Sequence, residues 1–511
     1  MGSRSGKATR NIVLEVGAQI ISYIFQFIIR TVFIITLGEV YLGINGVLTN
    51  VLSLLSLSEL GFSTAFAVSL YEPLTKKDNE KLAAILSYFK KVYLVVGIVV
   101  LALGLCLTPF LTFIIKADIS ENLYIIFLLY LLSSCVTYFS ASYTTFITAA
   151  QNGYVISIIK IVKSAVLLGL QIAALYNKDF YFYLIAIIIS NIVGVVLCYI
   201  YFGRKYKHVN QIKPGKIDKE TKQEIVSNTK ASFFHKLGGV VLSSTDNIVI
   251  STFISISVVG YYSNYSLIIG IISTLFALAV NALAAFVGEI NVISDNKTKS
   301  ILYWRLSYIN YVFTAISTVL LFALINPFIN IWAGPKYVLS LSFVIVLGVQ
   351  FYINSIRRIT QVYNMSLGLY VKYQYFPLIE AALNIVISIA LVKIIGLIGV
   401  ILGTIISVMV CTFVAERHVL LKYAIESNIK TFIKYDVLFL TSTAAMCCIA
   451  MLFYSNVTIS ESMFCDFAIK TIIISTITIM VFLVGMKFTC DGRWWLNYIR
   501  ERFLNRIINV F

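Results

Sequence analysis

The stretch Glu15–Arg30, EVGAQIISYIFQFIIR, places a line of polar side chains along an otherwise apolar segment. These are Glu15, Gln19, Ser22, Gln26 and Arg30, spaced 4, 3, 4 and 4 residues apart. Such spacing is one face of an α-helix, and at ~1.5 Å per residue the line runs about 22 Å, most of the hydrocarbon thickness of a bilayer. Charged side chains at the centre of a membrane helix cost roughly 2.5–3.5 kcal/mol, so they face protein or a wet cavity. The stripe indicates a path for a polar solute.

The same polar line recurs in the second half of the chain. Adding 217 to each position gives polar or small residues at all five places, with two further polar residues beside them. These are Ser232, Lys236, Gly239, Ser243 and Asn247, flanked by His235 and Asp246. The next segment aligns at the same offset, because Leu42-Gly43 corresponds to Val259-Gly260. We therefore expect two tandem copies of one helical unit.

The composition is that of a membrane protein. Hydrophobic residues make up 59% of the 511 residues and charged residues 12%, with a mean hydropathy of +0.91. A soluble domain has too little interior to bury so much apolar surface. We expect fourteen membrane spans. They cover residues 12–37, 42–70, 92–115, 123–148, 155–176, 181–203, 231–253, 258–287, 304–329, 338–364, 375–393, 397–416, 436–455 and 467–487.

These spans predict an all-α integral membrane protein with two pseudo-symmetric six-helix bundles and a C-terminal helix pair. With six spans, each copy begins and ends on the same side of the membrane. The two copies are then parallel and are related by an axis along the membrane normal. The expected parts are an N-terminal lobe (1–204), a basic cytoplasmic linker (205–229), a C-terminal lobe (230–420), a cytoplasmic loop with helices 13 and 14 (421–488), and a basic amphipathic cytoplasmic tail (489–511).

Basic residues fix the expected orientation. With both termini cytoplasmic, 34 of the 40 Lys and Arg residues lie in inner segments or at inner span ends, as the positive-inside rule requires. The net charge of +17 then reflects topology and attraction to anionic lipid headgroups rather than nucleic-acid binding. We expect a multi-pass protein of a bacterial cytoplasmic membrane.

The sequence lacks the usual signatures of an enzyme. No outer loop exceeds roughly a dozen residues, no Asp-x-Asp or Glu-x-Asp pair stands in these loops, and no ATP-binding Gly-rich loop is found. There are 3 histidines, and the 8 cysteines have no metal-ligand spacing. We expect no enzymatic activity, and therefore no catalytic residue, cofactor or metal site.

Two motifs resemble one family of transporters. Residues 57–65, LSELGFSTA, and 380–384, EAALN, followed by the glycines of 396–404, are similar to the polysaccharide transporters of the multidrug/oligosaccharidyl-lipid/polysaccharide exporter superfamily. Span count and basic inner loops extend the likeness over the whole chain. The resemblance favours the Wzx-type flippases, related to the MATE exporters and lipid II flippases. It implies that undecaprenyl-pyrophosphate-linked oligosaccharide moves from the inner to the outer leaflet for surface polysaccharide assembly.

Such a substrate needs a wet, cationic cavity, because its pyrophosphate and sugar hydroxyls cannot cross hydrocarbon unaided. Arg30 is the first candidate for a phosphate contact, since guanidinium pairs bidentately with phosphate oxygens. An internal ion pair with Asp246 is the alternative. The candidate head-group residues are Arg30, Gln19, Gln26, Lys236, His235 and Asn247. For Lys236 and His235, anchoring at the inner membrane surface stays open.

The remaining charged residues inside spans have two interpretations each. Asp246, Glu59 and Glu15 are candidates for coupling to an H⁺ or Na⁺ gradient, or for internal ion pairs. Arg357 and Arg358 either line an inner gate or reach lipid phosphates. Lys163 and Glu380, which match at the 217 offset, are expected to form a structural ion pair between the fifth and eleventh spans.

The expected mechanism is alternating access by rocking of the two lobes, driven as an antiporter by an ion gradient. Expected partners are the lipid-linked oligosaccharide, membrane lipids, the driving H⁺ or Na⁺, and a polysaccharide polymerase with its chain-length proteins. Two alternatives stay open. One is a MATE-like drug or metabolite exporter, and the other is a non-transporting scaffold of a polysaccharide-assembly complex.

Overall fold

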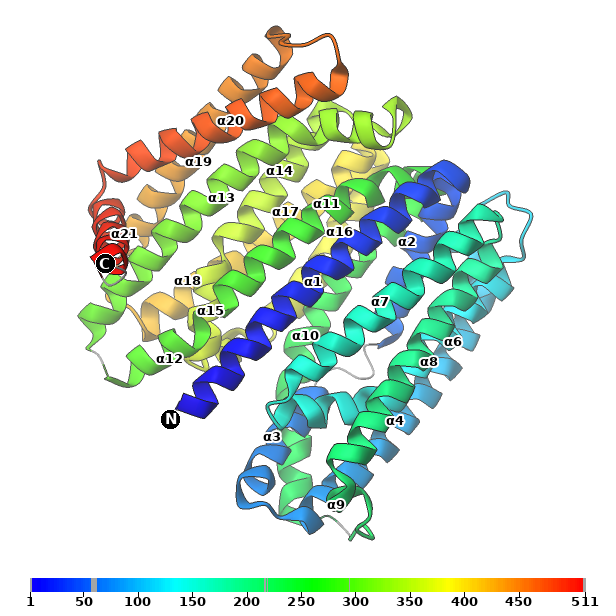
Figure 1. Cartoon of the computed structure of the whole chain (residues 1–511). Coiled ribbons are helices and arrows are strands. Elements are labelled where there is room, and N and C mark those ends of the chain that lie inside the picture. The colour runs from blue at the N-terminus through cyan, green and yellow to red at the C-terminus, as the bar shows by residue number, and fades with distance from the viewer. Residues whose placement is uncertain (1, 57–61, 216, 218, 294, 509–511) are drawn as a thin grey trace. The chain divides into compact units, whose positions relative to one another are not determined.

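The computed structural model describes residues 2–56, 62–215, 217, 219–293 and 295–508 (Figure 1). Within these residues the regular structure is entirely helical. The chain divides into two compact units, Met1–Ser263 with Pro377–Ala381, and Asn264–Phe376 with Ala382–Phe511.

The first unit is built from helices that follow one another closely along the chain. It contains α1 (Gly2–Thr36), α2 (Gly38–Leu55), α3 (Phe62–Lys76), α4 (Asn79–Leu107), η2 (Thr108–Phe110), α5 (Leu111–Ile114), α6 (Leu123–Ala149), α7 (Gly153–Tyr176), α8 (Phe180–Lys205), α9 (Lys207–Asn210), α10 (Lys219–Phe253) and the start of α11 (Ile256–Asn281). Helix α1 packs along α7, α7 along α8, and α10 along α2 and α3.

The second unit begins inside α11. It contains α12 (Ala284–Ile293), α13 (Asn296–Trp332), η3 (Pro335–Tyr337), α14 (Leu341–Ile356), α15 (Arg358–Ser366), η4 (Leu369–Tyr373), most of α16 (Phe376–Ile395), α17 (Leu397–Val410), α18 (Thr412–Tyr423), α19 (Ile429–Asn456), α20 (Met463–Met486) and α21 (Cys490–Ile508). Its centre is α13, which packs against α14, α19, α20 and α21.

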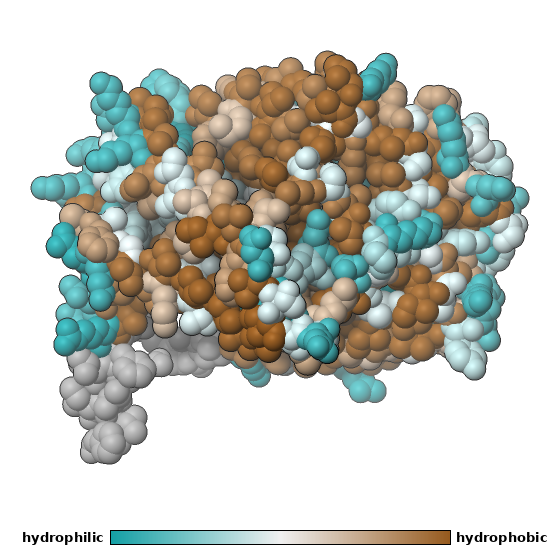
Figure 2. Space-filling view, turned by 90° about the horizontal axis from the view of Figure 1, so that it is seen from above, coloured by the Kyte–Doolittle hydropathy of each residue, from teal (hydrophilic) through white to brown (hydrophobic). Residues whose placement is uncertain are grey.

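The predicted all-α membrane fold is confirmed. Twelve helices in the described residues are long and apolar enough to cross a membrane. The two other predicted spans coincide with the shorter apolar stretch Leu237–Phe253 and with α14 followed by α15. Figure 2 shows brown apolar side chains over most of the face in view, where they would meet lipid rather than water.

The boundaries of the helices differ from the prediction in several places. Helix α10 starts at Lys219, inside the predicted linker 205–229, and packs with the first unit, whereas the predicted C-terminal lobe began at 230. The predicted span 338–364 is broken at Arg357, and the last quarter of the span 397–416 belongs to a separate helix that starts at Thr412. The tail after Cys490 forms the expected helix as far as Ile508.

The tandem repeat appears as pairs of equivalent contacts between α2 and the start of α11. A Cβ added at Gly43 would lie 2.0 Å from the Ile256 carbonyl oxygen, and one added at Gly260 would lie 2.2 Å from the Glu39 carbonyl oxygen. Positions 39 and 256, like 43 and 260, are related by the 217 offset. The two glycines thus interlock about a local two-fold axis, which supports the prediction of two copies of one unit.

Candidate functional site

A polar cavity of about 480 Å³ lies in the first unit, lined by α1, α2, α7, α8 and α10. This volume is within the usual range for small-molecule sites. Its polar lining residues are Ser22, Gln26, Arg30, Asn45, Thr49, Asn50, Ser164, Gln171 and Asn247. The polar line predicted in the first helix therefore does face a cavity, at Ser22, Gln26 and Arg30. Amide and hydroxyl side chains make up about half of the lining residues, and these groups suit hydrogen bonding to a hydroxyl-rich solute.

Arg30 is the one charged residue among the lining residues that the structure describes. Its Nη2 donates a hydrogen bond to the carbonyl oxygen of Ser263 at 3.0 Å. The equivalent residue in the second copy, Asn247, donates through Nδ2 to the carbonyl oxygen of Gly46 at 3.5 Å. Positions 30 and 247, and 46 and 263, are again separated by 217. The repeat thus conserves the hydrogen bond but leaves the cavity with a cation on one side only.

The buried carbonyl oxygen of the Asn247 side chain accepts no hydrogen bond within the described residues. Buried polar atoms are normally paired, and an unpaired one costs about 1–3 kcal/mol. Because Asn247 lines the cavity, this oxygen is an acceptor available to a hydroxyl group of a bound solute.

A second cavity of about 370 Å³ adjoins the first and shares Ser164, Leu167 and Ile187 with it. Lys160 and Lys163 of α7 line this cavity. The ammonium group of Lys160 donates a hydrogen bond to Oε1 of Gln19 on α1. The two adjoining cavities together have three cationic side chains in their walls, from α1 and α7.

Glycine at position 194 makes room for one of these cations. A Cβ added at Gly194 of α8 would lie 2.4 Å from Cδ of Lys163. The Ser190 hydroxyl, one turn earlier, donates to the Lys163 carbonyl oxygen at 3.0 Å. The close approach of α8 to α7 therefore sets the path of the Lys163 side chain.

The cavity lysines were missed by the sequence analysis as head-group candidates. Lys160 was assigned to the basic inner segments and Lys163 to an ion pair with Glu380. Lys160, Ser164, Leu167 and Gln171 are spaced 4, 3 and 4 residues apart, the same helical spacing as the polar line of the first helix. That spacing in the fifth span was the signal that would have revealed Lys160, whereas Lys163 does not lie on it.

The remaining residues predicted along the two polar lines lie in different surroundings. Glu15 is exposed, and its carboxylate attracts the ammonium group of Lys160. Asp246 is buried in α10, next to Asn247. Lys236 and His235 lie in the helical part of α10, but their side chains are outside the described residues, as is Glu59 altogether. An ion pair between Arg30 and Asp246 stays a prediction.

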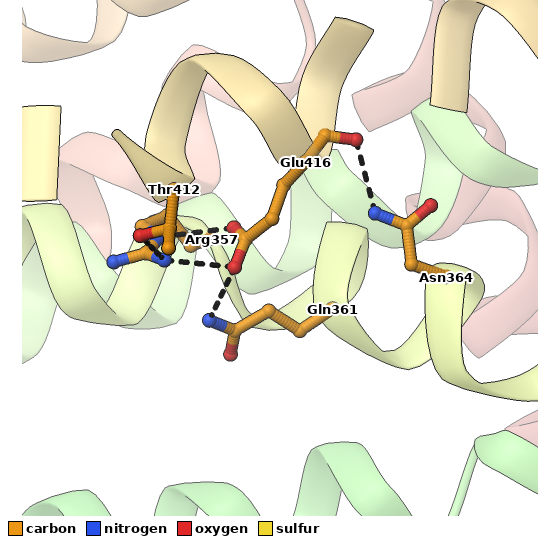
Figure 3. Close-up of polar contacts among 5 residues, drawn as sticks. All are labelled: Arg357, Gln361, Asn364, Thr412 and Glu416. Atoms are coloured by element: carbon orange, nitrogen blue, oxygen red, sulfur yellow. Dashed lines mark hydrogen bonds and ion pairs between the residues drawn. The ribbon is translucent and has the colours of Figure 1, made fainter. Parts of the chain in front are cut away.

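The second unit contains a buried polar network around Arg357 and Glu416 (Figure 3). Glu416 of α18 accepts hydrogen bonds from Arg357, whose Nη2 lies 2.7 Å from Oε1 and whose Nε lies 3.0 Å from Oε2. Nε2 of Gln361 donates a hydrogen bond to Oε1 of Glu416 at 3.1 Å. Oγ1 of Thr412 accepts a hydrogen bond from Nη2 of Arg357 at 2.5 Å. Asn364 donates to the Glu416 backbone oxygen at 2.9 Å.

The network joins two helix breaks. Arg357 is the residue between α14 and α15, and Thr412 is the first residue of α18, directly after the break at Cys411. Cys411 leaves the helical region, at φ −100° and ψ −90°, whereas Arg357 keeps helical angles, at φ −71° and ψ −20°. Interrupted helices at membrane depth are tolerated where protein groups surround the break. The buried ion pair provides those groups, so it braces both breaks at once.

Of the two alternatives for Arg357, the structure does not favour a contact with lipid phosphates. Its side chain is buried and bonded to Glu416, a partner that the sequence analysis did not consider because the two residues are 59 positions apart. Arg358 is half-buried, with its guanidinium carbon 5.5 Å from the ring centroid of Phe276. The gate role of both arginines stays a prediction.

The predicted ion pair of Lys163 with Glu380 also stays a prediction. The aliphatic part of Lys163 packs at Gly194, and Glu380 is buried in α16. Within the described residues, no three His, Cys, Asp or Glu side chains gather in a way that would hold a metal ion.

Comparisons with known proteins agree with this geometry. Residues 8–286, more than half of the chain, match the family described as polysaccharide biosynthesis protein. An inward-facing multidrug resistance MATE family transporter of the MOP superfamily has a TM-score of 0.65 at 12% identity, over 80% of this chain and 97% of that one. The lipid II flippase MurJ, in an inward closed conformation, has a TM-score of 0.64 at 17% identity, over 93% and 99%.

A Vibrio cholerae MATE transporter has a TM-score of 0.57 at 14% identity, over 83% of this chain and 98% of that one. At these identities the likeness establishes the fold. No curated protein sequence matches the chain. The family match and the fold together show that the chain belongs to the polysaccharide biosynthesis protein family and has the fold of the MOP-superfamily transporters.

Proposed function

We propose that the protein flips undecaprenyl-pyrophosphate-linked oligosaccharide from the inner to the outer leaflet of a bacterial cytoplasmic membrane. The observation that carries this proposal is the polar cavity with Arg30 in its wall and Lys160 and Lys163 in the adjoining one. The solute has an anionic pyrophosphate and many hydroxyls. The cationic side chains suit the pyrophosphate, and the amide and hydroxyl side chains suit the sugar hydroxyls.

The polar walls would let the head group cross the membrane without entering hydrocarbon. Moving an unpaired hydroxyl or amide from water into an apolar medium costs roughly 2–7 kcal/mol, and each sugar carries several such groups. A cavity lined by Gln26, Asn45 and Gln171 replaces the hydrogen bonds to water while the prenyl chain stays in lipid. Alternating access of two lobes then exposes the head group to one leaflet at a time.

The ion gradient is the proposed source of energy, and Asp246 is the proposed coupling residue. It is a buried carboxylate in α10, adjacent to Asn247 of the cavity wall. Buried ionisable groups of this kind mark ion or proton sites in transporters. We expect Asp246→Asn to abolish the response of transport to an imposed H⁺ or Na⁺ gradient. A variant that keeps the full response would exclude Asp246 from coupling.

The direct test is transport in liposomes. Purified protein is reconstituted with a labelled undecaprenyl-pyrophosphate oligosaccharide, and a glycosidase added outside reports its arrival in the outer leaflet. Arg30→Gln keeps a donor for the Ser263 carbonyl but removes the charge. We expect it to slow flipping by about tenfold or more, since a charge-assisted hydrogen bond contributes about 1.5–3 kcal/mol.

Arg30→Lys is the matched control, because it restores the charge without the planar guanidinium. We expect it to recover part of the rate. Undiminished flipping by Arg30→Gln at normal abundance would remove Arg30 from the proposed head-group site.

The alternative of a drug exporter rests on the MATE-like fold. A cavity for amphipathic cations needs an acidic lining, whereas the charged lining residue of this cavity is Arg30. No flipping of several repeat units under H⁺ and Na⁺ gradients, together with export of cationic dyes, would favour this alternative.

A further inference from the structure

A third cavity, separate from the two polar ones, lies between α4 and α6 in the first unit. It has a volume of about 340 Å³ and mainly apolar walls. Three of its lining residues, Leu94, Ile98 and Phe139, are 53%, 59% and 61% exposed. The cavity is therefore a groove that is open at the surface of the helix bundle, where the side chains meet the acyl chains of the bilayer.

The shape of the groove comes from a glycine. Gly97 lies at its centre, and a Cβ added there would be 3.3 Å from Cδ2 of Tyr138 on α6. The backbone carbonyl of Gly97 accepts a weak hydrogen bond from Sγ of Cys135 at 3.8 Å. The missing side chain brings the two helices close together and leaves an open channel along the α4 surface.

The groove has the length of one leaflet. Its lining residues on α4 extend from Lys90 to Leu101, eleven residues along a helix, or about 16 Å. Half of the ~30 Å hydrocarbon core is about 15 Å. An acyl chain that begins beside Lys90 would therefore end near Leu101, at the bilayer midplane.

One end of the groove is cationic and the rest is not. Lys90 is the charged residue of its described lining, and its Nζ lies 4.6 Å from the ring centroid of Tyr143 on α6. This cation–π contact holds the ammonium group at the end of the groove. Lys90 belongs to the basic segment 73–91, which the charge distribution assigns to the inner membrane surface. An ammonium group at that depth meets phosphate headgroups of the inner leaflet.

We propose that this groove is a binding site for one anionic phospholipid of the inner leaflet. The phosphate pairs with Lys90, and one acyl chain lies along Gly97 towards Leu101. The groove shares no lining residue with either polar cavity, although α6 also contributes Ser140 and Thr144 to the second one, so the lipid proposed here would contact a different set of side chains from the solute.

Native mass spectrometry of the full-length protein in detergent tests this directly. The probes are phosphatidylglycerol and phosphatidylcholine with the same acyl chains, titrated separately. We expect tighter retention of phosphatidylglycerol at one site, and an increase of about fivefold in its dissociation constant in Lys90→Gln, the value for one lysine at a lipid surface. Lys91→Gln is the matched control, since Lys91 is exposed, adjacent in sequence and outside the groove lining.

A second pair of variants tests the acyl-chain part of the site. Ile98→Trp fills the groove, whereas Leu103→Trp adds the same ring at an exposed position of α4 outside it. We expect Ile98→Trp alone to remove the site, with both variants keeping the wild-type melting temperature. Equal effects within either pair, or equal retention of the two phospholipids, would overturn the proposal. So would preferential retention of undecaprenyl phosphate, which would make the lipid carrier the occupant.

Discussion

Glu416 is a carboxylate that lies almost wholly out of solvent, at 4% exposure, and accepts hydrogen bonds from Arg357 and Gln361. The fork of the guanidinium matches both carboxylate oxygens, which is the strongest geometry for such a pair. A buried pair of this kind contributes little net stability over an apolar pair of the same size, but losing one partner leaves a charge uncompensated. The ion pair instead specifies how α15 packs against α18.

We expect Glu416→Gln to destabilise the protein by about 3–5 kcal/mol, because Arg357 then lies buried without a counter-charge. Thermal unfolding in detergent should show a clear drop in melting temperature. The double variant Arg357→Met/Glu416→Leu should recover most of the loss, since neither charge remains. A melting temperature of Glu416→Gln equal to that of the wild type would mean that the pair is not buried as described.

The polar residues of the cavities and of the buried network were only partly predictable from the sequence. Arg30 and Gln26 were found because they lie on a polar line in an otherwise apolar span. Lys160 and Lys163 were not, because two lysines near the inner end of a span also satisfy the positive-inside rule. Glu416 gave no signal at all, since its partner lies on another helix and only tertiary packing brings them together.

Helices α2 and α11 cross at two glycines whose neighbours are backbone atoms. At Gly43 and Gly260 an added Cβ would lie 2.0 Å and 2.2 Å from carbonyl oxygens of the other helix. Backbone atoms cannot rotate away as a flexible side chain can. Glycine at these positions therefore sets the distance between the helices, as small residues do in membrane helix pairs.

We expect Gly43→Ala and Gly260→Ala each to lower the free energy of unfolding by about 1–3 kcal/mol, the range for an overpacked contact. The pair should be alike in effect, because the contacts are equivalent in the two copies. Gly169→Ala is the control: no atom lies within 4 Å of its added Cβ, and an alanine in a helix is favoured by about 0.5–1 kcal/mol. Melting temperatures in detergent measure all three, and a destabilised control with unaffected crossing variants would refute this role of the glycines.

Periodicity and hydropathy located the long apolar helices but not the breaks within the predicted spans. The spans 338–364 and 397–416 were each predicted as one continuous helix because apolar residues stand on both sides of the breaks at Arg357 and Cys411. Conversely, α10 starts at Lys219, twelve residues before its predicted span. This extension was not predicted, because hydropathy does not detect a polar helix. Breaks and polar extensions depend on packing partners that a single sequence does not reveal.

The two copies of the repeat differ in charge at equivalent positions, and this difference makes the cavity asymmetric. Arg30 and Asn247 donate to equivalent carbonyl groups, yet only the first is cationic. A symmetric cavity would have presented two cations or none. The two copies thus share one backbone arrangement. The residues that differ between the copies determine where the positive charge of the site lies.

The membrane orientation of the chain is set by charges at the two ends of α20. Residues 457–466 contain no Lys or Arg, whereas the chain after α20 contains Lys487, Arg493, Arg500, Arg502 and Arg506. At 24 residues, about 36 Å, α20 is long enough to cross the bilayer. We therefore expect its ends on opposite sides of the membrane, with the later end in the cytoplasm as the positive-inside rule predicts.

Two native cysteines report this orientation. Cys465, near the start of α20, and Cys490, at the start of α21, are both exposed thiols. In intact bacterial cells we expect a charged, membrane-impermeant maleimide to label Cys465, and to label Cys490 only after permeabilisation. Cys465→Ser and Cys490→Ser assign each signal, and the double variant gives the background from Cys106 and Cys448, which lie on apolar helices that a charged reagent does not enter. Labelling of Cys490 in intact cells and of Cys465 only after permeabilisation would invert the topology, and with it the direction in which the cavity cations meet their substrate.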